Sequence, residues 1–324
     1  MTNELLTELG RPGKLVVLEY INRTWSSGQL PKLWRRAITV AVHKKGKDKR
    51  LPASFRPISL TSCLGKLAER MVNRRLVWYL EFNSLISRDQ AGFRRGKQTV
   101  DQLIRLTQSA TDGFQSHEHT LAVFIDLQQA YDKVWRSGLL LKLLNMGVSG
   151  RMYRWLKSFL KERVICTRVG RAQSEARTLE EGLPQGSALS CTLFLAFIND
   201  LSSGIRTHKA MFADDMVIWT RGTDLRLMEQ RLNRDLLTIS AYCNLWKLRV
   251  NVDKTVYSVF TNGTKILKHD FGLYMAGHRI AYDKAPRYLG VELDTRLTLQ
   301  DHVQDIVEQA TKRFGLIQKR ASTY

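Results

Sequence analysis

The stretch that decides the fold is Lys209-Ala-Met-Phe-Ala-Asp-Asp-Met-Val-Ile-Trp219. Two apolar runs flank the adjacent carboxylates Asp214 and Asp215, and this pattern predicts two strands joined by a tight turn. Two like charges at the tip of a hairpin repel each other unless a cation compensates them. Magnesium is the obvious candidate, because Mg²⁺ prefers carboxylate and phosphate oxygens. An ordinary turn is the alternative, because Asp-Asp pairs are common in turns.

A third carboxylate, Asp126, follows the short and fully apolar run 121–125. We expect this run to be a buried strand whose end delivers the carboxylate to the edge of a sheet with little freedom. Three carboxylates can anchor two magnesium ions about 4 Å apart, as phosphoryl transfer to a primer requires. The alternative for Asp126 is the N-cap of a following helix, a position that aspartate favours.

The charge balance points to a polyanionic partner. The 324 residues include 51 Lys and Arg against 30 Asp and Glu, a formal net charge of +21. Such an excess favours nucleic acid as the partner, with a merely soluble basic surface as the alternative. The four cysteines lack the spacing of a zinc site or a disulfide framework and indicate reduced thiols. We expect no signal peptide and no membrane span, and hence an intracellular protein of the cytoplasm, the nucleus or both.

Apolar periodicity predicts a mixture of helices and strands, and hence the α+β class. The sequence has neither a G-x-G-x-x-G fingerprint nor a P-loop, which argues against a doubly wound nucleotide-binding fold. The predicted helices are 64–82, 98–116, 134–146, 151–162, 188–201, 224–246 and 301–324, after a helical lead-in; the predicted strands are 37–42, 121–125 and 164–169.

Three segments resemble motifs A, B and C of a reverse transcriptase: Ala122–Trp135, Gly182–Ser187 and Phe212–Asp215. More narrowly, Phe55–Ser62, Gln90–Arg94 and the Phe-Ala-Asp-Asp form of motif C resemble non-LTR (LINE-type) retrotransposons near the jockey group. The motifs stand in the order and spacing of that family, so the resemblance covers most of the chain.

The resemblance implies a catalytic centre in which Asp126, Asp214 and Asp215 hold two magnesium ions. Lys254 matches a late-palm lysine of the family, a proposed general acid for the pyrophosphate leaving group. A surface lysine is the alternative reading of Lys254.

The resemblance also implies a site for the incoming dNTP. Arg56 matches a fingers arginine that clamps the triphosphate, and Lys44 or Lys45 lies in the loop that folds over the phosphates. Tyr131 stands where the family places an aromatic ring beside the sugar, where it clashes with a ribose 2′-OH. A core tyrosine is the alternative.

Gln185 and Gly186 match the family's turn near the nucleotide and the template, where glycine permits close backbone approach. Contacts to the RNA template and the DNA primer are expected mostly at the backbone, because a polymerase must copy any sequence. The residues implied for template and primer are Gln90, Phe93, Arg94, Tyr288 and Gly290.

Four positions depart from the family pattern. Cys191 and His43 stand where proline is usual, and Gln128 and Gln129 replace commoner charged residues. None of these departures removes a catalytic group.

The implied fold is a right-hand polymerase with a helical lead-in (1–34), fingers and palm (35–295) and the beginning of a truncated thumb (296–324). The expected activity is RNA-directed DNA synthesis, in which dNMP is added to a primer 3′ end. One alternative is a retroelement remnant that binds nucleic acid without processive synthesis. Another is an RNA-dependent RNA polymerase, which Tyr131 and the Leu183–Gly186 turn disfavour. We expect no endonuclease, zinc knuckle or RNase H region in this chain, and hence neither strand cleavage nor autonomous mobility.

Overall fold

The computed structural model describes residues 2–44, 46–263 and 266–321. Lys45, one of the two lysines implied to lie near the triphosphate, therefore falls outside the described residues. Within the described chain, no helix combines the length and the apolar character needed to cross a membrane.

The chain folds into two compact units, and each is assembled from three separate stretches. The predicted division into a lead-in (1–34), fingers and palm (35–295) and the beginning of a thumb (296–324) does not correspond to these two units and stays a prediction. Unit 1 comprises Met1–Arg88, Gln129–Leu201 and Leu245–Leu248, and unit 2 comprises Asp89–Gln128, Ser202–Asn244 and Arg249–Tyr324.

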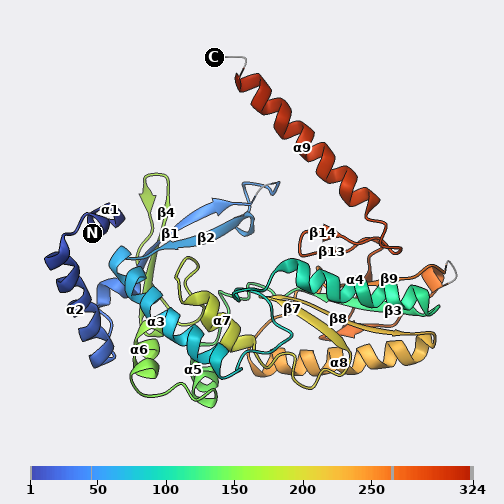
Figure 1. The fold of residues 1–324 in the computed structure, drawn as a ribbon, viewed down its shortest axis with the longest axis horizontal. Helices are drawn as coiled ribbons and strands as arrows, with labels where there is room; N and C mark the ends of the chain where they lie inside the picture. The colour runs from blue at the N-terminus through green and yellow to red at the C-terminus, as the bar shows by residue number, and fades with distance from the viewer. Residues whose placement is uncertain (1, 45, 264–265, 322–324) are drawn as a thin grey trace. The chain divides into compact units, whose positions relative to one another are not determined.

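A mixed sheet forms one part of unit 1 (Figure 1). Its strand β1 pairs antiparallel with β2 and parallel with β4, and β4 also pairs antiparallel with the short β5 and β6. The β-branched residues of β1 between Ile38 and Val42 favour the extended backbone. The strands are β1 (Arg36–His43), β2 (Phe55–Leu60), β4 (Arg163–Val169), β5 (Ala172–Gln173) and β6 (Arg177–Leu179).

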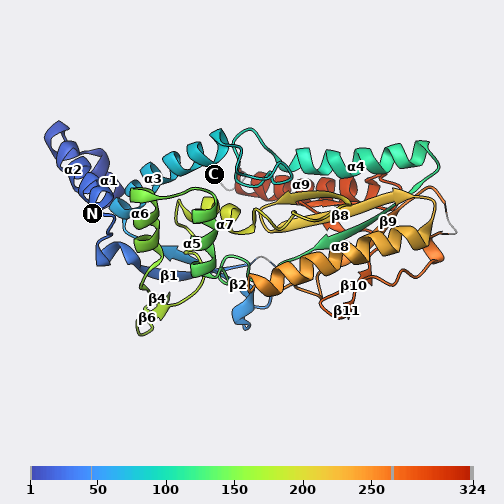
Figure 2. The same ribbon diagram turned by 90° about the horizontal axis from the view of Figure 1, so that it is seen from below.

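The helical part of unit 1 is built around α7. This helix is buried on every side from Thr192 to Ile198, as expected for a helix that is apolar all round. It packs against α5 and α3, while α6 packs against α5 and α2 (Figure 2). The elements are α1 (Asn3–Thr7), α2 (Arg11–Ser27), η1 (Lys32–Arg35), η2 (Pro52–Ser54), α3 (Cys63–Phe82), α5 (Arg136–Asn145), α6 (Gly150–Leu160) and α7 (Ser190–Ile198).

Unit 2 is built on a five-stranded sheet in the order β12-β9-β3-β8-β7. β3 is central and antiparallel to both β8 and β9, so it is shielded on its edges as well as its faces. Burial on both faces explains why its sequence is continuously apolar rather than alternating. The strands are β3 (His119–Ile125), β7 (His208–Phe212), β8 (Asp215–Gly222), β9 (Val256–Phe260) and β12 (Ala281–Tyr282).

Two helices cover this sheet, and both views show α4 and α8 on opposite sides of it (Figures 1 and 2). On the α4 side, Leu106 and Ala110 join Ala122 and Phe124 of β3 in one buried cluster. The helices of unit 2 are α4 (Thr99–Gln115), α8 (Leu225–Leu245) and α9 (Gln300–Ala321), with η3 (Ile266–Lys268) and the hairpins β10–β11 (Tyr274–Met275, His278–Arg279) and β13–β14 (Arg287–Tyr288, Val291–Glu292).

Within the described residues, the predicted elements are present with small shifts at their ends; the last three residues of the predicted helix 301–324 lie outside the described residues. The predicted strand 121–125 lies within β3, and the predicted helices 64–82 and 224–246 correspond to α3 and α8. The predicted helix 188–201 is shorter, because α7 ends at Ile198.

Candidate active site

The hairpin of β7 and β8 presents the two adjacent aspartates. Phe212 pairs with Asp215, so the two-residue turn consists of Ala213 and Asp214, and Asp215 is the first residue of β8. Ala213 has a φ of 55°, in the left-handed region that residues other than glycine adopt rarely. The predicted strand–turn–strand is therefore confirmed, although only one of the aspartates lies in the turn itself.

Gln90 holds this turn in place. Its Oε1 accepts a hydrogen bond from the Ala213 N–H at 2.8 Å, and its Nε2 donates to the Ala213 carbonyl at 3.1 Å. The same Oε1 accepts from the Gly92 N–H at 2.8 Å. A Cβ at Gly92 would lie 2.2 Å from the Ala213 nitrogen, so only glycine permits this approach.

Gln90 is only 1% exposed, and its amide is used within the protein. Its placement therefore does not support the predicted direct contact of this side chain with a template. Phe93 is 53% exposed and remains accessible, whereas Arg94 is half-buried and donates to the Gln90 carbonyl at 3.0 Å. The template contacts of Phe93 and Arg94 stay predictions.

Asp126 follows the last residue of β3, and hydrogen bonds from the loop 251–255 hold it in place. Asn251 Nδ2 donates to Asp126 Oδ2 at 2.8 Å, and the Asn251 N–H donates to the Asp126 carbonyl at 2.8 Å. The Asp126 N–H donates to Thr255 Oγ1 at 3.3 Å. Lys254 Nζ lies 3.8 Å from Asp126 Oδ2.

This arrangement also decides the alternative reading of Asp126. The chain after it runs through turns, and the next helix, α5, begins only at Arg136. Asp126 is therefore not a helix N-cap. The sequence analysis missed Asn251 and Thr255, although both lie within the same short segment as Lys254.

Burial and neighbouring negative charges raise the pKa values of Asp214 and Asp215. Burial raises the pKa of Asp214, and the charge of Asp126 raises it further. Asp215 keeps solvent access, but desolvation and the charges of Asp214 and Asp126 raise its pKa to about 6, against a smaller opposing effect of Lys254. Crowded carboxylates with raised pKa values are the environment that a bound cation stabilises.

The donor set suits a hard divalent cation, because it consists of carboxylate oxygens that repel one another. The side chains are not already arranged around a single point, however. Among the residues that the structure describes, no three His, Cys, Asp or Glu side chains form a ready-made metal cluster. One Asp126 oxygen is instead occupied by Asn251 and faces Lys254.

Tyr288, predicted at the primer, lies in the β13–β14 hairpin and is only 3% exposed. Its ring packs on Phe124 with centroids 5.6 Å apart. Burial, with a further contribution from the charge of Asp215, raises the pKa of Tyr288 well above its usual range. Gly290, at the tip of the hairpin, is exposed with a φ of 90°, and its backbone is the accessible part of this segment.

The residues implied for the dNTP lie in unit 1. Arg56 is exposed on β2, and Lys44 directly follows β1. Tyr131 is half-buried and stacks on Phe194, with ring centroids 4.4 Å apart and an interplanar angle of 18°. The stacking fixes the plane of the Tyr131 ring. Both a sugar gate and a core tyrosine need a fixed ring, so the role of Tyr131 beside the sugar stays a prediction.

The turn that contains Gln185 and Gly186 is tied to its surroundings. The Gln185 side chain donates a hydrogen bond to Asp132 Oδ1 at 3.0 Å. The backbone carbonyl of Gln185 accepts a hydrogen bond from the Ser59 N–H at 2.7 Å. Gly186 has a φ of 105°, and a Cβ there would lie 3.0 Å from the Ser59 carbonyl oxygen. Residue 186 must therefore be glycine, because its positive φ and its close approach to Ser59 leave no room for a side chain.

Two buried charged residues that the sequence analysis missed support this turn. Glu69 of α3 accepts hydrogen bonds from the Ser187 hydroxyl and, at 3.0 Å, from the Ala188 N–H. Burial raises the pKa of Glu69, while these donors and the charge of Arg163 oppose the shift. Arg136 donates to the carbonyls of Gly182, Glu181, Leu160 and Leu179.

Comparison with solved structures defines the fold of the chain. Apo telomerase from Candida tropicalis aligns with a TM-score of 0.57 at 10% identity, covering 88% of this chain and 53% of that chain. Telomerase from Candida albicans in complex with a fragment of telomeric RNA aligns with a TM-score of 0.52 at 13% identity, covering 86% and 48%. Such low identity shows the fold alone, and the fold is that of a right-hand polymerase of mixed helices and sheets, as predicted.

The sequence comparisons then show the family. The family model described as reverse transcriptase (RNA-dependent DNA polymerase) matches residues 42–293, and the chain belongs to this family. Two relatives from Drosophila melanogaster are the probable RNA-directed DNA polymerase from transposon BS, 34% identical over 87% of this chain, and the RNA-directed DNA polymerase from mobile element jockey, 31% identical over 88%. The chain spans about a third of the length of these relatives, 32% of each. The predicted resemblance to the jockey group is confirmed.

Proposed function

We propose that this chain carries RNA-directed DNA polymerase activity, adding dNMP from a dNTP to the 3′ end of a DNA primer on an RNA template. The observation that supports this proposal best is the electrostatic coupling of Asp126, Asp214 and Asp215 in unit 2 of a reverse transcriptase family member. The three carboxylates lie at the end of β3 and at the β7–β8 turn. Like charges at such a site favour the binding of cations together with a polyanionic substrate.

Asp126, Asp214 and Asp215 are the residues that would hold magnesium. Two bound Mg²⁺ ions supply neutralisation of the triphosphate and activation of the primer hydroxyl. The protein contributes fixed positions for the carboxylates, through Asn251 and Thr255 for Asp126 and through Gln90 for the turn of Asp214. The Lys254 side chain is exposed beside Asp126, and it is the proposed donor of a proton to the leaving pyrophosphate.

Primer extension on poly(rA)/oligo(dT) with dTTP tests the proposal. The parent chain should extend the primer with Mg²⁺, stop when EDTA removes the metal, and resume when Mg²⁺ is restored. Asp214→Ala should lower the rate by roughly 10²-fold to 10³-fold or more, because a preorganised charge is lost. Asp305→Ala, an exposed change on α9, is the matched control.

Extension that survives Asp214→Ala contradicts the catalytic assignment. No extension by the parent chain, with template binding retained, instead supports the alternative of a remnant that binds nucleic acid.

The sugar-gate role of Tyr131 has its own test. Tyr131→Val should increase incorporation of ribonucleotides relative to deoxyribonucleotides, because the ring that clashes with the 2′-OH is removed. Tyr131→Phe keeps the ring stacked on Phe194 and should keep the discrimination. The ratio of kcat/KM for rTTP and dTTP measures the effect, and an unchanged ratio in Tyr131→Val rules out this role.

A further inference from the structure

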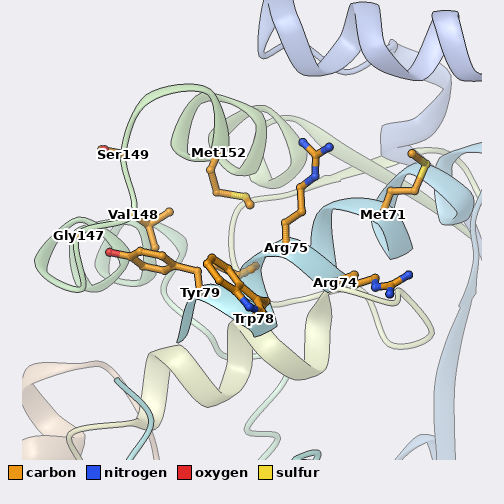
Figure 3. Close-up of a pocket in the computed structure, with 10 residues that line it drawn as sticks. Met71, Arg74, Arg75, Trp78, Tyr79, Gly147, Val148, Ser149 and Met152 are labelled. Carbon is orange, nitrogen blue, oxygen red and sulfur yellow. The ribbon is translucent and has the colours of Figure 1, made fainter. Parts of the chain in front are cut away.

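A cavity of about 730 Å³ in unit 1 lies apart from every residue assigned above (Figure 3). Its volume is within the range of roughly 300–1,000 Å³ that is usual for ligand sites. One wall comes from α3, and the other comes from the α5–α6 connection and α6. In Figure 3, Trp78 and Tyr79 project from α3, and Met152 faces them from α6.

The inner wall of the cavity is preformed. The Tyr79 hydroxyl donates to the Met146 carbonyl at 3.0 Å. A Cβ at Gly147 would lie 2.6 Å from that hydroxyl oxygen, so the glycine allows the tip of the tyrosine to approach the loop. A ligand therefore meets an ordered surface, which reduces the conformational entropy lost on binding.

Two aromatic rings extend this wall into solvent. Trp78 is 62% exposed and Phe82, four residues later on α3, is 72% exposed. Their rings stack on each other, with centroids 5.0 Å apart and an interplanar angle of 18°. Such a pair offers flat π faces on which unpaired bases stack without sequence preference.

The rim of the cavity is basic. Arg74 and Arg75 line it, and none of the described lining residues is acidic. Within the described part of the chain, no carboxylate forms an ion pair with either arginine; Arg75 instead lies 5.0 Å from the centre of the Trp25 ring. Arg151 and Arg154, on either side of Met152, are also exposed. The charge therefore complements an anionic ligand.

We propose that this cavity and the Trp78–Phe82 pair at its edge bind single-stranded RNA, with unpaired bases on the two rings and phosphates on Arg74 and Arg75. Stacked aromatic planes beside arginines that no described carboxylate neutralises are the composition of single-strand binding surfaces. An acidic protein segment would satisfy the charges and the apolar wall, but it would not require stacked planes. The proposal rests on the proposed function only in taking RNA as the ligand.

The test is fluorescence-anisotropy binding of a labelled 20-nucleotide oligo(U) to the full chain in EDTA, where no synthesis occurs. Trp78→Leu keeps an apolar side chain but removes the π face, and it should weaken binding about tenfold, since the stacking of a base on the ring is lost. Trp78→Phe should restore most of the affinity. Phe314→Leu, an exposed aromatic change on α9, is the matched control and should leave the affinity unchanged.

Photo-crosslinking with 4-thiouridine RNA gives a second readout, and the cross-links should map to the tryptic peptide Leu76–Arg88. Equal affinities of Trp78→Leu and the parent chain, or no cross-link within that peptide, would overturn the proposal. Both measurements are independent of primer extension, so a failure of the proposed polymerase activity leaves them unaffected.

Discussion

At the tip of the β7–β8 hairpin, Ala213 holds a left-handed backbone conformation that costs a non-glycine residue about 1–3 kcal/mol. The buried Gln90 offsets that cost, since it donates a hydrogen bond to the Ala213 carbonyl and accepts one from the Ala213 N–H. The conformation of the residue next to Asp214 therefore depends on a side chain distant in sequence. We infer that Gln90 is a positioning residue for the carboxylate.

Gln90→Met should lower kcat by roughly 10-fold to 100-fold, since unsatisfied buried groups cost about 1–3 kcal/mol each and the turn then relaxes. The KM for dTTP should change little, because Gln90 does not contact the nucleotide in this role. Steady-state primer extension measures both constants. Gln108→Met, an exposed change on α4, is the matched control, and a rise in KM without loss of kcat would contradict the positioning role.

The sequence was informative about the carboxylates and uninformative about their supports. Asp126, Asp214 and Asp215 stand at the ends of apolar runs, and the strand pattern predicts where such residues lie. Gln90 stands in a polar, glycine-containing loop, where a buried glutamine has the same sequence pattern as an exposed one. The contact that buries Gln90 spans 123 residues, a separation that local periodicity does not report.

At the level of elements, the loop between β6 and α7 has no helical or strand hydrogen bonds. Two buried charged side chains bind its backbone groups instead. Arg136, at the start of α5, donates to three carbonyls between residues 179 and 182, where this loop begins, and to the carbonyl of Leu160 at the end of α6. Glu69 accepts from the N–H and hydroxyl groups at its end. The burial of Glu69 could have been predicted from the sequence, since it lies at helical spacing on the apolar face of α3 with Ala68 and Val72.

Arg136→Lys should lower the free energy of unfolding by about 2–4 kcal/mol, because one ammonium cannot replace the planar fork that reaches several carbonyls. Urea denaturation measures the loss. Arg177→Lys, an exposed change on β6, should have almost no effect. Equal stability of the two variants would show that the carbonyls find other donors.

For the whole molecule, the net charge of +21 predicts an RNA affinity dominated by counterion release. The logarithm of the association constant should fall linearly with the logarithm of salt concentration, by about 10³-fold between 50 and 200 mM salt if six or more phosphates are contacted. A peptide nucleic acid of the same base sequence lacks phosphates and should show no such slope. A slope near zero for RNA would contradict the electrostatic prediction.

The order in which the chain visits its two units also limits how the protein can be made. Unit 1 includes Leu245–Leu248, where Trp246 packs between Trp135 and Phe197 and its ring lies 3.8 Å from Lys142 Nζ. A growing polypeptide therefore cannot complete its first-begun unit until residue 248 has left the ribosome. No single cut separates the two units from each other, and a chain that terminates before residue 245 leaves both of them unfinished.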